Sequence, residues 1–365
     1  MQKYFSENWY HATDKFVNNA RDFGSVNWCV LGNYKYDIPY ATIGDGADKI
    51  LIYSGLNGLD AFYGSAAQNM FLDKFAPRLS AEFRKKYTII LVHVVNGYGM
   101  DNRIIETVDA DGNLVHLNRN FVIDYNKLPE NTKYQYAHKM LLGKPGTKKI
   151  NKLTEYRKQH LYDNTWYAIA DGQYTHKNGL FYGGQIPTAE NQMMMSICDK
   201  TIGNSKFAQV FGLYTGDGFY NDVYGNVSGT LQVLHSENHP AAQFYRHICW
   251  NMKNNVAARP HYTINGNFAH ALEHRLVGAT KKIFATDFFV GTKKTTDVPH
   301  INKFYHMGNA RYELQKYGEI SDKTKDILLN AFCPSSSMWR KAAMEETYRF
   351  YQDIINYMNA QCKSR

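Results

Sequence analysis

Two short apolar runs constrain the fold of this chain most. Residues 49–54 (KILIYS) and 87–95 (YTIILVHVV) are almost continuously apolar and rich in β-branched side chains. Strands of this composition are covered on both faces, as in a parallel or mixed sheet that lies between helices. Residues 207–213 and 282–289 repeat the pattern less purely. The chain is therefore expected to contain at least four buried strands.

Helical segments lie between these strands. Residues 60–75 are rich in Ala and Phe and precede Pro77, while residues 338–360 carry an apolar stripe behind the N-cap candidates Ser335 to Ser337. Strands that alternate with helices predict an α/β three-layer sandwich, which we interpret as one domain over residues 1–365. Because ligands of open α/β sheets bind beyond the carboxyl ends of strands, the turns after the first three strands are the expected place for chemistry.

A longer motif follows the first strand. Residues 54–68 read SGLNGLDAFYGSAAQ. This segment resembles the first zinc motif of an uncharacterised bacterial family with the carboxypeptidase A-like fold, Ser-Gly-x-His-Gly-x-Glu-Gly-Phe-x-Gly-Ser-x-x-Gln. The resemblance continues in order through HVVNGYG at 93–99, VHLNRNF at 115–121, GQY at 172–174, GLFYGG at 179–184 and FCP at 332–334. It implies a mixed, roughly eight-stranded sheet with the site at the carboxyl edge of its strands.

The same resemblance implies that the zinc ligands have been replaced. The family's His-x-x-Glu pair falls on Asn57 and Asp60, and the His of its Asp-x-His-Thr-Gly motif falls on Tyr214, with Gly212 at the Asp position. An amide oxygen is a weaker ligand than imidazole, and a tyrosine must lose a proton with an ordinary pKa of about 10. We therefore expect zinc to be absent and no other cofactor to be required.

The general base is also replaced. The family's Glu-Phe-Gly-Thr falls on residues 289–292, which places Phe289 where the catalytic glutamate is expected. A phenyl ring cannot transfer a proton. Asp287 lies two residues earlier, on the same face if this segment is a strand, and is a weak candidate for that role.

Residues that could hold a carboxylate are retained. Asn118 and Arg119 match the family's Asn-Arg pair, and Arg103 lies where a second arginine is expected after the 93–99 loop. An arginine fork suits a peptide C-terminus, since it donates two parallel hydrogen bonds to a carboxylate. The alternative is that Arg119 is a buried structural arginine paired with an acid.

A second metal signal is weaker. Residues 270–274 spell His-x-x-Glu-His, in which His270 and His274 share a helix face, with Glu346 as a distant third ligand. The competing interpretation is a surface helix with two incidental histidines. The HSENH segment at 235–239 is weaker still.

Charge and cysteine usage limit the partners. Between Lys127 and Lys158 the chain carries eight Lys and one Arg against two Glu, which is most of its net charge of +9. This basic insertion at about 127–160 could meet nucleic acid, anionic lipid or an acidic partner, although we favour a solvated surface insertion. Five scattered cysteines, no signal-like N-terminus and no membrane span favour the cytoplasm, or export by a signal-independent system.

Three functions remain open. The leading hypothesis is a catalytically silent relative of zinc carboxypeptidases that binds a peptide, a C-terminal carboxylate or a protein partner. The second is a hydrolase, a peptidase or amidase, with another metal or none, using Asp60, Asp287 or Asp217. The third is an interaction protein that acts through the basic insertion.

Overall fold

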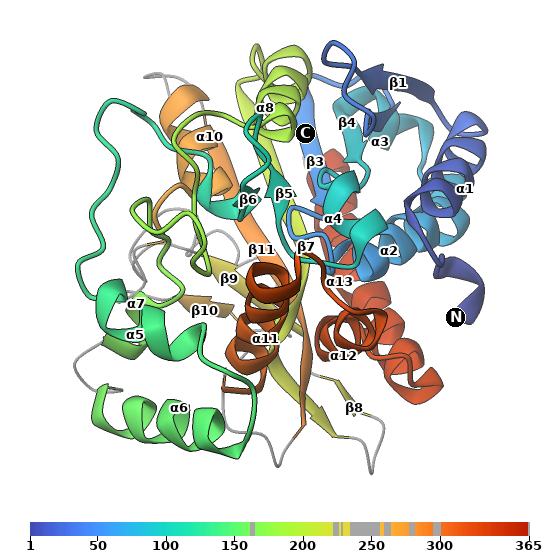
Figure 1. Ribbon diagram of the computed structural model, residues 1–365. Helices are drawn as coiled ribbons and strands as arrows, with labels where there is room; N and C mark the ends of the chain where they lie inside the picture. Colours follow the sequence, from blue (N-terminus) through green and yellow to red (C-terminus); the bar gives the residue numbers. More distant parts are fainter. Residues whose placement is uncertain are drawn as a thin grey trace.

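One mixed sheet runs through the molecule (Figure 1). The computed structural model describes residues 1–160, 165–221, 226–227, 229–233, 256–258, 264–276, 282–294 and 301–363. Within these residues the sheet has nine strands, in the order β1-β2-β4-β3-β7-β11-β9-β10, with β8 beside β7. Eight strands on one path confirm the predicted α/β fold with a roughly eight-stranded mixed sheet.

The strands differ in direction. β3 is parallel to β4 and β7, and β7 is parallel to β11, so the carboxyl ends of four central strands meet at one edge. β2 and β9 run antiparallel to their central neighbours. The strands are β1 Ser25–Cys29, β2 Ile38–Ile43, β3 Asp48–Ser54, β4 Tyr87–Val92, β7 Phe207–Asn221, β8 Asn226–Val227, β9 Gly229–Val233, β10 Val256–Ala258 and β11 Lys282–Lys294, with β5 Thr107–Val108 and β6 Leu114–Val115 forming a separate pair.

Helices cover both faces of the sheet. Successive side chains of a strand point to opposite faces, and accordingly Ile50 and Ile52 pack with α1, α2 and α13, while Leu51 and Tyr53 pack with α8 and α10. The helices are η1 Gln2–Tyr4, α1 Trp9–Arg21, α2 Ala61–Lys74, η2 Ala76–Arg78, α3 Ala81–Lys86, α4 Gly97–Asn102, η3 Leu117–Arg119, α5 Tyr134–Leu141, α6 Thr147–His160, α7 Thr165–Ala168, α8 Ala189–Thr201, α10 Phe268–Leu276, α11 Ile301–Tyr317, α12 Asp322–Phe332 and α13 Ser337–Lys363. No helix in the described ranges is long and apolar enough to cross a membrane.

The elements predicted from apolar runs are present, with one shorter than expected. The run at 87–95 forms strand only to Val92, and the chain then turns away through Val94, whose φ is 41°. The predicted helices at 60–75 and 338–360 are α2 and α13. The early end of β4 places the 93–99 motif in the loop and α4 beside the site.

Helix α2 explains several residues of the long motif. It is buried from Ala61 to Leu72, and small residues let it approach the sheet, since a Cβ on Gly64 would lie 2.4 Å from that of Ser54. The amide of Gln68 donates to the carbonyls of Ile52 at 3.2 Å and Val92 at 2.9 Å. The motif therefore fixes α2, and the loop before it, against β3 and β4.

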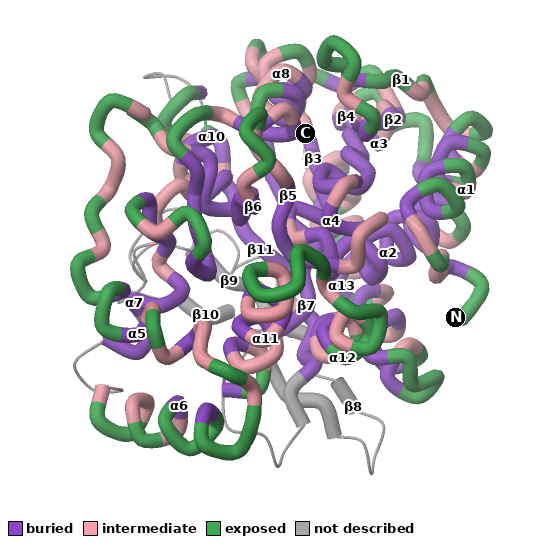
Figure 2. The backbone as a smooth tube through the Cα atoms, viewed as in Figure 1, coloured by how far each residue is buried: buried purple, intermediate pink, exposed green. Residues whose placement is uncertain are grey.

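The basic insertion folds into helices. Figure 1 shows α5, α6 and α7 together, with α11 lying between them and α12. Tyr134, Leu141 and Leu153 are buried in a core cluster with α11 residues such as Phe304 and Met307. The outer side of α6 is largely exposed (Figure 2), so the insertion has one packed face and one solvated face.

Candidate functional site

Three adjacent strands place Tyr53, Gly212 and Asp287 in one row. Gly212 of β7 pairs with Tyr53 of β3 on one side and with Asp287 of β11 on the other. The Tyr53 hydroxyl donates to Oδ1 of Asp287 at 2.7 Å. A Cβ on Gly212 would lie 2.4 Å from that oxygen and 2.5 Å from the hydroxyl. This hydrogen bond therefore requires a glycine at position 212, where the resemblance places the family's Asp.

The next row along the strands holds Tyr214 and Phe289, which are register partners. Their rings stack with centroids 5.1 Å apart and planes 17° apart. Tyr214 is 2% exposed, and its hydroxyl accepts a hydrogen bond from the Asn118 amide at 3.2 Å. Burial raises the pKa of Tyr214 well above 10, and the Asp287 carboxyl acts in the same direction. The third ligand position therefore carries a neutral phenol, stacked on the ring at the base position.

Asn57 and Asp60 lie in the turn between β3 and α2. The Asn57 amide donates to Oδ2 of Asp60 at 2.8 Å, and the Thr215 hydroxyl donates to Oδ1 at 2.5 Å. Burial raises the pKa of Asp60 to about 6, against the effect of these hydrogen bonds and of the Lys303 ammonium. Gly58 permits this turn, because a Cβ there would lie 2.4 Å from Cα of Gly99 in α4.

These side chains do not fit a catalytic zinc, which needs about three N or O ligands and an open position. Both carboxyl oxygens of Asp60 already accept hydrogen bonds from the protein, and Tyr214 is held as a neutral phenol. Oδ1 of Asn57 is buried without a hydrogen-bond partner in the described part of the chain, but it is a single neutral ligand. Among the described residues, no group of three or more His, Cys, Asp or Glu side chains could hold a metal ion.

Asp287 occupies the predicted strand face beside Phe289. It is 2% exposed, and burial raises its pKa to about 7, although the Tyr53 hydroxyl and the Arg119 guanidinium oppose that shift. It is therefore a protonatable group inside the site, held by Tyr53. The backbone of Asp217 lies in β7, but its side chain is outside the described residues.

Arg119 and Asn118 lie in η3 and are almost fully buried. The Arg119 guanidinium donates to the Ala170 carbonyl at 2.8 and 2.6 Å and to the Asn118 carbonyl at 2.6 Å. Oδ1 of Asn118 accepts from the backbone N–H of Phe268 at 3.1 Å. Both side chains thus connect the site to neighbouring loops.

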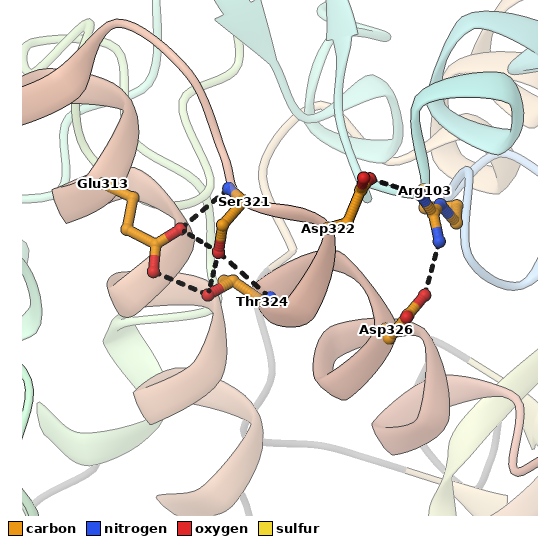
Figure 3. A network of polar contacts seen from close by, with 6 residues as sticks. All are labelled: Arg103, Glu313, Ser321, Asp322, Thr324 and Asp326. Carbon is orange, nitrogen blue, oxygen red and sulfur yellow. Dashed lines mark hydrogen bonds and ion pairs between the residues drawn. The ribbon is translucent and has the colours of Figure 1, made fainter.

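Arg103 points away from this network. It ends α4 in a left-handed conformation with φ 54°, and its guanidinium bridges two carboxylates of α12 (Figure 3). One contact, to Asp322, is 2.6 Å long, and the other is to Asp326. Arg103 is therefore not grouped with Arg119, and it joins α4 to α12.

The His-x-x-Glu-His segment is helical, as expected, and forms part of α10. His274 is exposed, and the Glu273 carboxylate accepts a hydrogen bond from the Ala285 N–H at 3.4 Å. Glu346 accepts from Arg349 on α13, whose core residues pack on the opposite face of the sheet from those of α10. The structure therefore does not bring Glu346 to His270. Residues 235–239 lie outside the described part.

Sequence reasoning missed three site residues. Tyr53 and Thr215 each adjoin a motif residue, so strand alternation and the sheet register could have indicated them. Lys303 carries no local signal, because it enters from α11, far along the chain. Its ammonium lies 4.4 Å from the Phe332 ring centroid and would be 2.9 Å from a Cβ on Gly216.

The sheet and this edge site define a metallocarboxypeptidase fold. Bovine thrombin-activatable fibrinolysis inhibitor, solved with tick carboxypeptidase inhibitor, matches with a TM-score of 0.50 and 10% identity, over 95% of this chain and 98% of that one. Carboxypeptidase A from Helicoverpa armigera has a TM-score of 0.49 at 9% identity, over 93% of this chain and 73% of its own. Metallo-carboxypeptidase from Burkholderia cenocepacia has a TM-score of 0.45 at 9% identity, covering 93% of this chain and 69% of that one. At such low identities, the first match shows the fold alone.

Family membership follows from the sequence. The model of the family described as Protein of unknown function (DUF2817) matches residues 5–346, and the chain belongs to this family. No curated protein matches the chain. The suspected family with a carboxypeptidase-like fold is thereby confirmed.

Proposed function

We propose that this protein binds a peptide or protein ligand at the carboxyl edge of its sheet and does not act as a zinc peptidase. One observation carries the proposal: the ligand and base positions form a closed network in which Asn57, Asp60 and Tyr214 bond to other protein groups and Phe289 stacks on Tyr214. A site arranged in this way lacks both a water-activating metal and a general base at the expected positions.

Metal content tests the silent-site part of this proposal. We expect the purified protein to contain well under one zinc per chain, and chelators to leave its melting temperature unchanged. Peptides with free C-termini should remain intact when zinc is added. The proposal would be overturned if the protein contained one zinc per chain and the Asn57→Ala variant contained none. If instead the His270→Ala variant lost the zinc, the metal site would lie on α10.

The ligand proposed for the cleft carries a free C-terminal carboxylate. The supporting feature is the positive charge of Arg119, which opposes the effect of burial on the pKa of both Asp171 and Asp287. A charge-assisted contact contributes roughly 1.5–3 kcal/mol, so peptides with free C-termini should bind about tenfold or more tightly than amidated ones. Titration calorimetry measures this ratio, and Arg119→Ala should bring it to one in a folded protein. If free and amidated peptides bound equally to the unaltered protein, the proposal of a carboxylate ligand would be wrong. The proposal that the site is catalytically silent would not be affected.

A metal-free hydrolase is the second candidate, favoured by one observation. Burial raises the pKa of Asp60 to about 6 and that of Asp287 to about 7, which is the range suited to proton transfer near neutral pH. Asp287→Asn distinguishes the two candidates. It should abolish hydrolysis of peptides or amides if the protein is an enzyme, and should leave peptide binding unchanged if the site is silent.

The basic insertion is the third candidate, as a surface that binds anionic partners. Its supporting feature is that Lys127, Lys144 and Lys158 are exposed, the first two in the loops that flank α5 and the third on α6, which packs on the core cluster. Binding to a polyanion should weaken steeply between 50 and 300 mM salt if charge drives it. Absence of any salt-dependent binding would leave the insertion a solvated part of the fold.

A further inference from the structure

Helix α6 is held in one rotational setting by its packing. Leu153 and Lys149 are its buried residues, and Lys149 donates from its ammonium to Oδ1 of Asn309 on α11 at 2.9 Å. The same ammonium lies 5.4 Å from the ring centroid of Tyr305. Burial lowers the pKa of Lys149 to about 8, so this lysine serves packing rather than surface charge. The opposite face of α6 is thereby fixed towards solvent.

A shallow groove of about 590 Å³ runs along one flank of α6, between its buried and its exposed face and beside Met140 of α5. It is lined by α6 residues that include Lys148, Lys152 and Glu155, and by Met140 of α5. These α6 positions are spaced by three or four residues and so form one stripe on the helix. The half-buried apolar lining residues, Met140 and Tyr156, also pack against the core cluster beneath. The groove thus has an apolar floor on a firm support.

The rim of the groove is positively charged. The carboxylate of Glu155 is paired with Lys158 at 2.9 Å, one turn further along the helix. Lys148 and Lys152 are exposed, and neither takes part in an ion pair within the described part of the chain. A ligand with an apolar side chain flanked by carboxylates would complement this site. Its carboxylates would lie near the lysines of the rim, and its apolar side chain would pack on the floor.

We propose that the α6 groove binds an acidic, amphipathic helical segment of a protein partner. The inference rests on the proposal that the insertion is an anion-binding surface, and it adds the class of the partner. Nucleic acid would complement the lysines of the rim, but the Glu155 carboxylate would repel its phosphates. The floor of the groove also contains Met140 instead of the row of aromatic rings on which bases stack. A lipid surface requires apolar side chains that project outward, whereas Met140 and Tyr156 are recessed. The 14 residues of α6 span about 21 Å, which sets the length of the bound segment at about four turns.

The probe is a fluorescein-labelled 14-residue peptide, acetylated and amidated, with leucine at positions i, i+3, i+4 and i+7 of a helix and glutamate elsewhere. Its amidated end keeps the carboxylate cleft out of the measurement. We expect fluorescence anisotropy to show saturable binding at 150 mM salt, weakened about tenfold by Lys148→Glu with Lys152→Glu. The matched control, Lys177→Glu with Lys323→Glu, makes the same charge change at exposed sites outside the insertion and its groove and should alter affinity less than twofold.

The floor and the partner class are tested separately. Met140→Ala should weaken the leucine peptide about fivefold and leave a capped 14-residue polyglutamate unaffected. If polyglutamate binds as tightly as the leucine peptide, the insertion is an anion-binding surface and the groove inference is wrong. Tighter binding of single-stranded DNA or of phosphatidylserine vesicles at 150 mM salt would overturn the partner class. If no polyanion bound, both this inference and the proposal that the insertion is an anion-binding surface would be wrong.

Discussion

At the centre of the site, the side chains of Tyr53 and Asp287 leave no room for a side chain at Gly212. The hydrogen bond from Tyr53 to Asp287 crosses the position where a side chain on Gly212 would lie. The resemblance places an Asp there, as the support of a zinc-bound histidine. A side chain at position 212 and the Tyr53–Asp287 hydrogen bond therefore cannot both be accommodated without movement of their neighbours.

Gly212→Ala should accordingly destabilise the protein. Its Cβ would meet two side-chain oxygens at 2.4 and 2.5 Å and a carbon of the Tyr214 ring at 2.6 Å, and overpacking of this kind costs about 1–3 kcal/mol. Urea denaturation measures the loss. In a Tyr53→Phe, Asp287→Ala background both oxygens are gone, so the cost of Gly212→Ala should fall. An unchanged cost in that background would show that the Tyr214 ring or the backbone, and not the two oxygens, requires the glycine.

The two buried carboxyls predict an unusual pH dependence. Folded Asp60 and Asp287 have pKa values of about 6 and about 7, whereas an aspartate in the unfolded chain titrates near 3.9. Between these values the folded state binds more protons than the unfolded state, so these two groups lower the free energy of unfolding as pH rises from about 4 to 7.

Asp287→Asn isolates this effect, since the amide cannot ionise and its oxygen can still accept from Tyr53. The variant should match the unaltered protein at pH 4.5 and exceed it by about 2–4 kcal/mol at pH 8 in urea denaturation. Asp111→Asn, at an exposed loop position, is the control and should change neither value. A variant that is less stable at pH 8 would mean that Asp287 is ionised and held by its neighbours.

Between elements, Arg103 is the clearest link, since it ties the end of α4 to α12 (Figure 3). Its partners Asp322 and Asp326 have side chains 81% and 65% exposed, so each ion pair contributes no more than about 1 kcal/mol. Arg103→Ala should lower the melting temperature by about 2 °C at low salt and by less at 1 M salt. The exposed pair of Lys158 with Glu155 lies within α6, and Lys158→Ala should cost less. Unchanged stability with weaker peptide binding would instead assign Arg103 to ligand recognition.

The elements that sequence predicted are those whose signal is local. Burial of β3 and β4 could be predicted from their apolar runs, and burial of α2 from its small residues. Helices α5 and α6 were expected only as a solvated insertion, because their lysines obscure the few buried positions, and Lys149 breaks the usual pattern by being buried itself. Their packing on α11 joins residues 160 positions apart in the sequence, which no local pattern records.

The replaced ligands could be predicted, but the closed network could not. Asn57, Asp60, Tyr214 and Phe289 follow from aligned motifs. That Tyr53 reaches Asp287, and that Thr215 holds Asp60, depends on the register of β3, β7 and β11. Register is set by the whole sheet, so these contacts appear only when the strands are assembled.

At the scale of the whole molecule, the fold and the site respond differently to substitution. The motif residues that hold elements together, such as Gln68 beneath β3 and β4 and Asn96 at the start of α4, keep their hydrogen bonds. The side chains that would meet a metal or a substrate have been exchanged for others that bond to each other. The molecule therefore keeps the carboxypeptidase-like fold, and under the function proposed above this edge of the sheet binds a ligand without hydrolysing it.

Restoring the metal should therefore require more than restoring the ligands. A variant with Asn57→His, Asp60→Glu and Tyr214→His regains three zinc-binding side chains, but the new histidine at 214 lacks its supporting carboxylate. Gly212→Asp can supply that support only if Asp287→Gly and Tyr53→Phe vacate the space, because its Cβ would lie 2.4 Å from the Asp287 carboxyl oxygen and 2.5 Å from the Tyr53 hydroxyl. Residues that hold a metal ligand in place typically change zinc affinity by ~10–100-fold, so the six-substitution variant should bind zinc more tightly than the triple variant by about that factor. Competition with a chromophoric chelator measures both affinities.

Neither variant should cleave a peptide while Phe289 occupies the base position, and hydrolysis by either would show that another group supplies the base. Equal zinc affinity in the two variants would mean that position 212 and Asp287 are not coupled to the ligand site.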